Sequence, residues 1–258
     1  MSARDVIVTG YPKSGNTWLS RLVAELLALP AGAFVGDGES EILPVDCASS
    51  TDDPCVRKSH YTVRELAQHL NPGRVIYVVR DPRDVAVSAS HNFRKRFRVV
   101  PDNRMGDVMM RLPFLESVYD SLFGKRIRIQ RMIHVLQHGR FDMRWCRVPW
   151  DVHVRDSLES DCVVVRYEDM LSDPFQQCER ILSHLGETRS KEHIEGAIHN
   201  QSFDVVKSRA QADGDASAEA FLRRGTGGQW RKRLTAHQKA VLSQSFADVL
   251  TRLGYDRS

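Results

Sequence analysis

Three short runs of consecutive apolar, mostly β-branched residues occur in the chain, at positions 6–9, 75–79 and 162–165. A run without alternation is typical of a strand that is buried on both faces, as in a parallel sheet covered by helices. Apolar residues at helical spacing follow Thr17 and recur at 63–70, 175–185 and 235–253. The pattern predicts an α/β fold with a central parallel sheet flanked by helices.

The ends of the last predicted helix carry typical terminal residues. Thr235 precedes the apolar pattern as an N-cap, and Gly254 follows it at the position where a left-handed residue ends many helices. Two other stretches have no regular pattern, residues 93–110, which are rich in arginine, and residues 208–220, which are small, polar and acidic. We expect residues 208–228 to form a mobile lid.

The first apolar run leads into a glycine-bracketed turn, GYPKSGNTW at residues 10–18, and then into a helical pattern. A strand, a glycine-rich loop and a helix N-terminus together form an anion site, because backbone N–H groups converge and the helix dipole is positive there. The spacing is close to the nucleoside triphosphate loop, but Asn16 stands where that motif has lysine, and Lys13 comes earlier. The loop is therefore expected to bind an anion other than a magnesium-bound β/γ-phosphate.

Further segments with candidate chemistry follow along the chain: RKSH at 57–60, RDPRDVAVS at 80–88, WDVHVR at 150–155, RYEDM at 166–170, NQSFDVVK at 200–207 and FLRRGTGGQW at 221–230. With the loop at 10–18, these segments resemble, in the same order, the motifs of sulfotransferases that use 3′-phosphoadenylyl sulfate (PAPS). The resemblance spans about residues 6–235 and implies a three-layer fold like that of P-loop nucleotide hydrolases.

The resemblance assigns two groups of residues to the nucleotide. Those implied for the 5′-phosphosulfate are Lys13, Ser14, Gly15, Asn16, Thr17 and Trp18, and those implied for the 3′-phosphate are Arg80, Ser88, Arg223, Arg224 and Gly225. The aromatic and neighbouring residues implied for the nucleotide's adenine side are Tyr167, Ser202 and Phe203. Arginine pairs and backbone amides are well suited to phosphate because they donate several hydrogen bonds at once.

Catalysis is implied for three residues. His60 resembles the general base that removes the proton of the acceptor hydroxyl, and histidine suits this step because its usual pKa is roughly 6.5. Lys13 and Lys58 would stabilise charge in an in-line displacement at sulfur. His91 is the second candidate for the base.

Some positions depart from the family pattern or allow a structural explanation. Asn16 and Gln201 each replace a threonine, and Gln229 replaces an aspartate. Arg80–Asp84 could form an ion pair at a helix cap, and the acidic pair after Tyr167 could cap the helix that starts near position 174. The segment at 150–155 is interpreted as mainly architectural.

Composition limits the remaining choices. The 258 residues suit a single domain over 1–258, and 37 Lys and Arg against 33 Asp and Glu give a net charge of only +4, which gives little support for nucleic-acid binding. No apolar stretch approaches the roughly 20 residues of a membrane span. Five cysteines without a C-x-x-C pair argue against a disulfide framework or zinc site, so a reduced cytoplasm and no metal are expected.

The acceptor is left open. Residues 31–56 and 91–150 are expected to supply its site, for a phenol, a sugar hydroxyl or a bulky natural product. The sequence does not predict an oligomeric state. Two alternative functions remain: a P-loop kinase or other nucleotide-dependent phosphotransferase, and a non-catalytic protein that binds PAPS or its product PAP (3′,5′-ADP).

Overall fold

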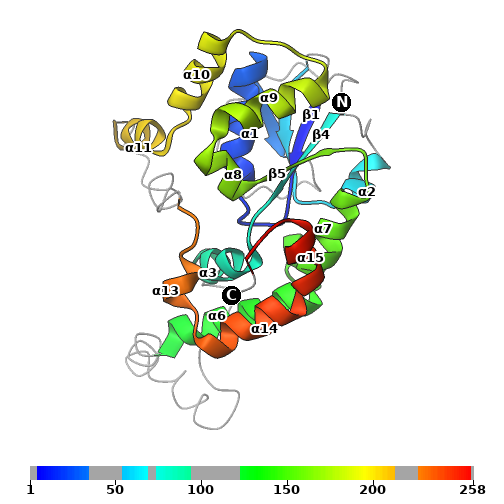
Figure 1. Cartoon of the computed structure of the whole chain (residues 1–258), viewed down its shortest axis with the longest axis vertical. Coiled ribbons are helices and arrows are strands. Elements are labelled where there is room, and N and C mark those ends of the chain that lie inside the picture. Colours follow the sequence, from blue (N-terminus) through cyan, green and yellow to red (C-terminus); the bar gives the residue numbers. More distant parts are fainter. Residues whose placement is uncertain (1–4, 35–53, 69–73, 94–122, 213–225, 257–258) are drawn as a thin grey trace. The chain divides into compact units, whose positions relative to one another are not determined.

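The computed structural model describes residues 5–34, 54–68, 74–93, 123–212 and 226–256. The chain forms two compact units (Figure 1), Met1–Arg80 with Val152–Gly227, and Asp81–Asp151 with Gly228–Ser258. Each unit is described by itself. The expected single domain over 1–258 stays a prediction.

The first unit contains a five-stranded sheet in the order β2-β3-β1-β4-β5. The strands are β1 (Val6–Thr9), β2 (Ala31–Phe34), β3 (Val56–Lys58), β4 (Val75–Val79) and β5 (Val163–Arg166). The strand pairings among the described residues are all parallel, with Val8 opposite Lys58 on one side and Ile76 on the other. The carboxyl ends of β1, β3 and β4 therefore meet at one edge, where α/β proteins bind ligands.

The three strands predicted from apolar runs are confirmed, with β5 displaced by one residue toward the C-terminus. β1 and β4 are completely buried, which explains why both read as uninterrupted apolar runs. β2 and β3 were not predicted. β3 consists of three residues, two of them charged, and is held by pairing with β1 and β2.

Helices cover both faces of the sheet in this unit. On one face, α1 (Asn16–Leu27), α8 (Tyr167–Ser172), α9 (Pro174–Leu185) and α10 (Lys191–Asn200) pack around a core that includes Val6, Val8, Ile76, Val78 and Val165. On the other face, His153 of α7 (Trp150–Leu158) contacts Tyr77 of β4. The expected α/β fold with a central parallel sheet flanked by helices is confirmed.

α2 (Val63–Ala67) and α11 (Phe203–Ala212) are the other helices described in the first unit. α2 begins with a capping box, in which the Thr62 and Glu65 side chains bond to each other's backbone N–H. α11 follows α10 after two residues. The cap of α9 is Asp173, whose carboxylate accepts from Gln176 N at 3.1 Å, rather than the acidic pair after Tyr167.

The second unit is helical in its described residues. It contains α3 (Pro82–Asn92), α6 (Lys125–His138), the 3-10 turn η4 (Arg144–Cys146), α13 (Trp230–Arg233), α14 (Ala236–Ser245) and α15 (Ala247–Arg252). The predicted caps at Thr235 and Gly254 are confirmed. The prediction of one helix over 235–253 is wrong, because the helix breaks at Phe246, a buried residue whose ring lies 5.0 Å from that of Trp150.

Candidate active site

Two residues of the loop between β1 and α1 have backbone conformations in the left-handed region. Lys13 has φ 71° and Gly15 has φ 106°. A Cβ on Gly15 would lie 2.6 Å from the ring of Tyr167, so no larger side chain fits there without displacement of the ring. Ser14 N donates to Tyr11 O at 3.2 Å and closes the turn. The loop therefore needs glycine at position 15 for two reasons, backbone conformation and close packing.

The N-terminus of α1 lies at the end of this loop. No side chain among residues 5–34, 54–68, 74–93, 123–212 and 226–256 caps it, and no acidic residue occupies its first turn. The hydroxyl of Ser14, which is fully buried, has no hydrogen-bond partner among the described residues. A buried hydroxyl and an uncapped helix terminus side by side fit an anionic ligand that accepts hydrogen bonds.

Asn16 joins the loop to the neighbouring strand end. Its Nδ2 donates to Gly10 O at 3.3 Å and to Tyr11 O at 3.1 Å, and it lies 3.3 Å from Nδ1 of His60. Two carbonyl oxygens around one atom identify that atom as the amide nitrogen. Asn16, which replaces the family's threonine, thus bonds to the backbone of its own loop.

His60 follows β3 and lies beside this loop. Its Nδ1 is 2.9 Å from Gly10 O, and because a carbonyl only accepts, Nδ1 carries the proton. The lone pair of the neutral ring is then on Nε2. Burial, followed by the charge of Lys58, lowers the pKa of His60 to about 3. The imidazole is therefore neutral near pH 7, as a proton acceptor must be.

Two lysines lie near this histidine. Lys58, on β3, donates from Nζ to Thr17 Oγ1 at 3.2 Å. Burial lowers the pKa of Lys58, and the charge of Arg21 lowers it further. Lys13 is close enough to His60 for its charge to contribute to the lowered pKa of the imidazole. The loop, His60 and both lysines are thus brought together at one edge of the sheet.

Arg80 leaves the end of β4 and points at the same loop. Its guanidinium donates from Nη1 to Lys13 O at 3.3 Å and from Nη2 to Thr226 O at 3.0 Å. It also lies 4.3 Å from the centre of the Tyr167 ring, a cation–π distance. These contacts orient Arg80 beside the loop between β1 and α1.

The residues predicted for the adenine side belong to the first unit. The rings of Trp18 and Tyr167 meet edge to face at 5.7 Å, and Trp18 Nε1 donates to Gln201 O at 2.8 Å. Ser202 and Phe203 follow directly, at the start of α11. Tyr167 is buried between Gly15 and Arg80.

The other predicted residues are placed elsewhere. Ser88 lies on α3 in the second unit. The buried ion pair of its motif joins Asp81 to Arg83, at 2.8 Å, and Asp84 accepts from Gly228 N and Trp230 N at 2.6 and 3.0 Å. Arg223, Arg224 and Gly225 lie outside the described residues, as do parts of the predicted acceptor segments and lid.

A family model for the sulfotransferase domain matches residues 3–254. The chain belongs to the sulfotransferase family. The prediction of a sulfotransferase is therefore confirmed. The family also excludes the alternative of a P-loop kinase. Relatives of this sulfotransferase include rat sulfotransferase 1A1, 24% identical with 96% of this chain and 84% of the relative covered, and human sulfotransferase 2A1, 24% identical with 96% and 85% covered.

Solved structures support the same fold. Mouse sulfotransferase SULT7A1, in complex with PAP, matches this sulfotransferase with a TM-score of 0.66 at 17% identity, covering 96% of this chain and 85% of that one. Retinol dehydratase, in complex with androsterone and the inactive cofactor PAP, matches with a TM-score of 0.64 at 18% identity, covering 97% and 81%. The three-layer P-loop-like fold is confirmed by these likenesses.

Sequence reasoning gave the segment at 150–155 only an architectural role and missed a polar contact made by His153. This side chain bonds to the backbone of His60 and to Tyr77. The motif at 150–155 includes this histidine, but its residue types do not indicate which groups the side chain contacts. Only the packing of α7 on the sheet reveals it.

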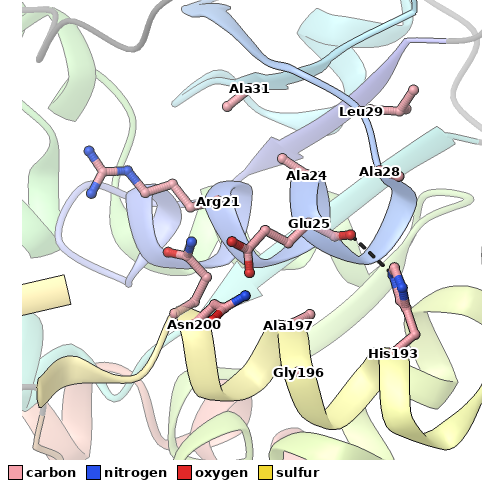
Figure 2. A pocket seen from close by; sticks show the side chains of 11 residues that line it. Arg21, Ala24, Glu25, Ala28, Leu29, Ala31, His193, Gly196, Ala197 and Asn200 are labelled. Atoms are coloured by element: carbon pink, nitrogen blue, oxygen red, sulfur yellow. Dashed lines mark hydrogen bonds between the residues drawn. The ribbon is translucent and has the colours of Figure 1, made fainter. Parts of the chain in front are cut away.

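A groove between α1 and α10 was also missed. It encloses about 600 Å³, and Figure 2 places Arg21 and Glu25 of α1 opposite Asn200 and His193 of α10, with His193 bonded to the backbone oxygen of Glu25. Gln201 lines the groove, is 8% exposed, and its Oε1 has no partner among the described residues. The groove therefore adjoins the segment predicted for adenine.

The described residues contain no group of three or more His, Cys, Asp or Glu side chains that could hold a metal ion. No helix in the same part of the chain is both long and apolar enough to span a bilayer. The absence of a metal requirement stays a prediction.

Proposed function

We propose that this sulfotransferase takes its sulfuryl group from PAPS and transfers it to a hydroxyl, less readily an amine, of a small or medium-sized acceptor. The observation that carries the proposal is the anion loop at the N-terminus of α1, with a neutral His60 beside it and a buried Ser14 hydroxyl that has no hydrogen-bond partner in the described part of the chain. An anion site next to a proton acceptor is what this transfer requires.

PAPS, when bound, supplies the sulfuryl group and leaves as PAP. In this proposal the backbone N–H groups at Gly15–Thr17 and the Ser14 hydroxyl bind the 5′-phosphosulfate. Arg80 binds the 3′-phosphate, together with Ser88, Arg223, Arg224 and Gly225. Tyr167, Ser202 and Phe203 hold the adenine side, and Trp18 belongs to the 5′-phosphosulfate loop. The Arg80 contact with Lys13 O supports a link between the two phosphate sites.

His60 is the proposed general base and accepts the acceptor's proton at Nε2. The bond from Nδ1 to Gly10 O supports this assignment, because it leaves the lone pair on Nε2. Lys13 and Lys58 offset negative charge that develops during transfer. Because this charge is greatest in the transition state, the two cations stabilise the transition state more than the ground state and so raise the rate. The proposal needs no metal.

The relatives support a small-molecule acceptor. The retinol dehydratase structures contain androsterone or retinol beside PAP. For this chain we propose residues 31–56 and 91–150 as the acceptor site and residues 208–228 as a lid over the nucleotide. We also propose a cytoplasmic location, with no nucleic-acid or membrane partner. A non-catalytic PAP-binding protein is the remaining alternative.

Titration calorimetry of the purified protein with PAP, ATP and 5′-AMP, with and without magnesium, tests the nucleotide. PAP should bind at least 10-fold more tightly than 5′-AMP without magnesium, because only PAP has the 3′-phosphate. A preference for ATP that requires magnesium would overturn the proposal. Labelled PAPS is then incubated with phenols, sugars and hydroxylated natural products, and PAP binding without transfer to any of them would favour the non-catalytic alternative.

A further inference from the structure

A chain of hydrogen bonds runs from Tyr77 through His153 to the backbone carbonyl of His60. Tyr77 Oη lies 2.8 Å from His153 Nδ1, and His153 Nε2 lies 3.1 Å from His60 O. The three residues come from β4, from α7 and from the loop after β3. Because a carbonyl only accepts, His153 Nε2 carries the proton, so Nδ1 accepts from the Tyr77 hydroxyl.

The surroundings fix this arrangement. Tyr77 is fully buried and His153 is 2% exposed. Burial lowers the pKa of His153, which keeps the ring neutral and leaves it a single proton to donate. The Tyr11 ring of the phosphate loop meets the His153 ring edge to face at 5.7 Å. A buried neutral histidine with both nitrogens bonded has one orientation and one tautomer.

The loop that carries His60 is therefore anchored at three points. His153 holds the carbonyl of residue 60, Thr9 Oγ1 donates to Tyr61 O at 2.7 Å, and Gly10 O accepts from the ring of His60. The first two anchors bind the carbonyl oxygens of His60 and Tyr61, so they hold the backbone directly after the His60 Cα. The third anchor holds the ring itself.

We propose that His153, oriented by Tyr77, is a positioning residue that fixes the backbone of His60 so that Nε2 faces the acceptor hydroxyl. The inference rests on the proposed role of His60 as general base. A displacement of about 1 Å in a catalytic group can reduce turnover about 100-fold. Loss of the His153 contact should therefore reduce kcat while nucleotide binding, which uses other residues, changes little.

The test compares His153→Leu, which cannot donate to His60 O, with His153→Gln, whose side-chain amide can donate from nearly the same place. His153→Leu should lower kcat about 100-fold with KM for PAPS and PAP affinity within 2-fold, and His153→Gln should restore at least 10-fold of that loss. Tyr77→Phe, a smaller change, should lower kcat several-fold. The acceptor is the compound with the highest turnover in the labelled-PAPS screen.

His193→Leu is the matched control. His193 also contacts backbone carbonyls through Nε2, those of Glu25 and Leu26 at the end of α1, and this contact is remote from His60 in the fold. His193→Leu should leave kcat within 2-fold. An unchanged kcat in His153→Leu, an equal loss in the control, or a loss of PAP affinity parallel to kcat would each overturn the positioning role.

Nitrogen NMR of ¹⁵N-histidine-labelled protein gives a readout that does not require turnover. In wild type, His60 should be protonated at Nδ1 and His153 at Nε2. The His60 signals should move or broaden in Tyr77→Phe and His153→Leu and stay in place in His193→Leu. Unmoved His60 signals in both variants would overturn the inference, even if His153→Leu is poorly folded, because Tyr77→Phe alters only one hydroxyl.

His60→Ala separates the inference from the proposed function. If this variant keeps full turnover, the proposed base is wrong, whatever the NMR shows. If it loses turnover and His153→Leu does not, the base assignment stands and the positioning role is overturned.

Discussion

Arg80 and Arg83 are three residues apart in one motif, yet their surroundings differ. Arg80, in the first unit, donates to the carbonyl oxygens of Lys13 and Thr226. Arg83, in the second unit, pairs with the Asp81 carboxylate at 2.8 Å, donates to Asp256 O at 2.5 Å and lies 3.8 Å from the centre of the Trp230 ring.

The difference shows how one motif can serve two purposes. The carbonyl oxygens that accept from Arg80 carry no net charge, and the proposed function assigns this guanidinium to the 3′-phosphate. The carboxylate of Asp81 neutralises Arg83, which is only 1% exposed. A separate bond from Arg83 to Asp256 O ties α3 to the C-terminal segment. A buried ion pair of this kind is a structural element whose loss exposes the remaining charge to an apolar environment.

Arg83→Met gives the largest expected effect and tests the structural half of the comparison. It leaves the Asp81 carboxylate buried without its cation, which should reduce the free energy of unfolding by about 3–5 kcal/mol. Urea unfolding followed by circular dichroism measures this loss. PAP affinity of the folded protein should stay within 3-fold, so a selective loss of PAP binding with unchanged stability would reverse the assignment.

Arg80→Met is the matched variant, and it tests the proposed phosphate-binding role of Arg80. Hydrogen bonds to charged groups contribute about 1.5–3 kcal/mol, so PAP affinity should fall about 10- to 100-fold in calorimetry. The free energy of unfolding should fall by less than in Arg83→Met. The comparison fails if Arg80→Met destabilises the protein as much as Arg83→Met, or if it binds PAP as tightly as wild type.

Ser243→Ala gives the smallest expected effect and sharpens the account of Arg83. Ser243 Oγ accepts from Arg83 Nη1 at 3.3 Å, and its loss should cost about 0.5–1 kcal/mol because the Asp81 pair remains. Ser245→Ala is the control on the same helix, since Ser245 is exposed and bonds to the neutral Gln137 amide. A larger loss in Ser245→Ala would show that the bond to Arg83 adds nothing.

Much of the candidate site was predictable from local sequence. The apolar runs of β1 and β4 are completely buried, so their composition alone indicated parallel strands. Gly15, the apolar helix pattern after Thr17 and the position of Arg80 at a strand end indicated an anion site. Each of these signals arises from residues that are close in the sequence, because strand burial, loop conformation and helix N-termini are local properties.

Other features were set by contacts between distant segments. β3 has two charged residues out of three and gains its strand conformation from pairing with β1 and β2. The helix predicted over 235–253 breaks at Phe246, which is buried against Trp150, although its apolar pattern runs through the break. Pairing and packing partners of this kind cannot be read from the segment itself.

The sequence by itself thus determined the class of fold, the glycine-containing loop between β1 and α1, and the family to which its motifs point. Only the tertiary structure decided that Arg83 is neutralised while Arg80 points at the loop, and that His153 holds the backbone of His60 across 93 positions of the chain. The physical reason is that charge compensation and hydrogen bonding depend on which groups meet at distances near 3 Å. That proximity is created when α7 packs on the sheet and when the C-terminal segment packs on α3.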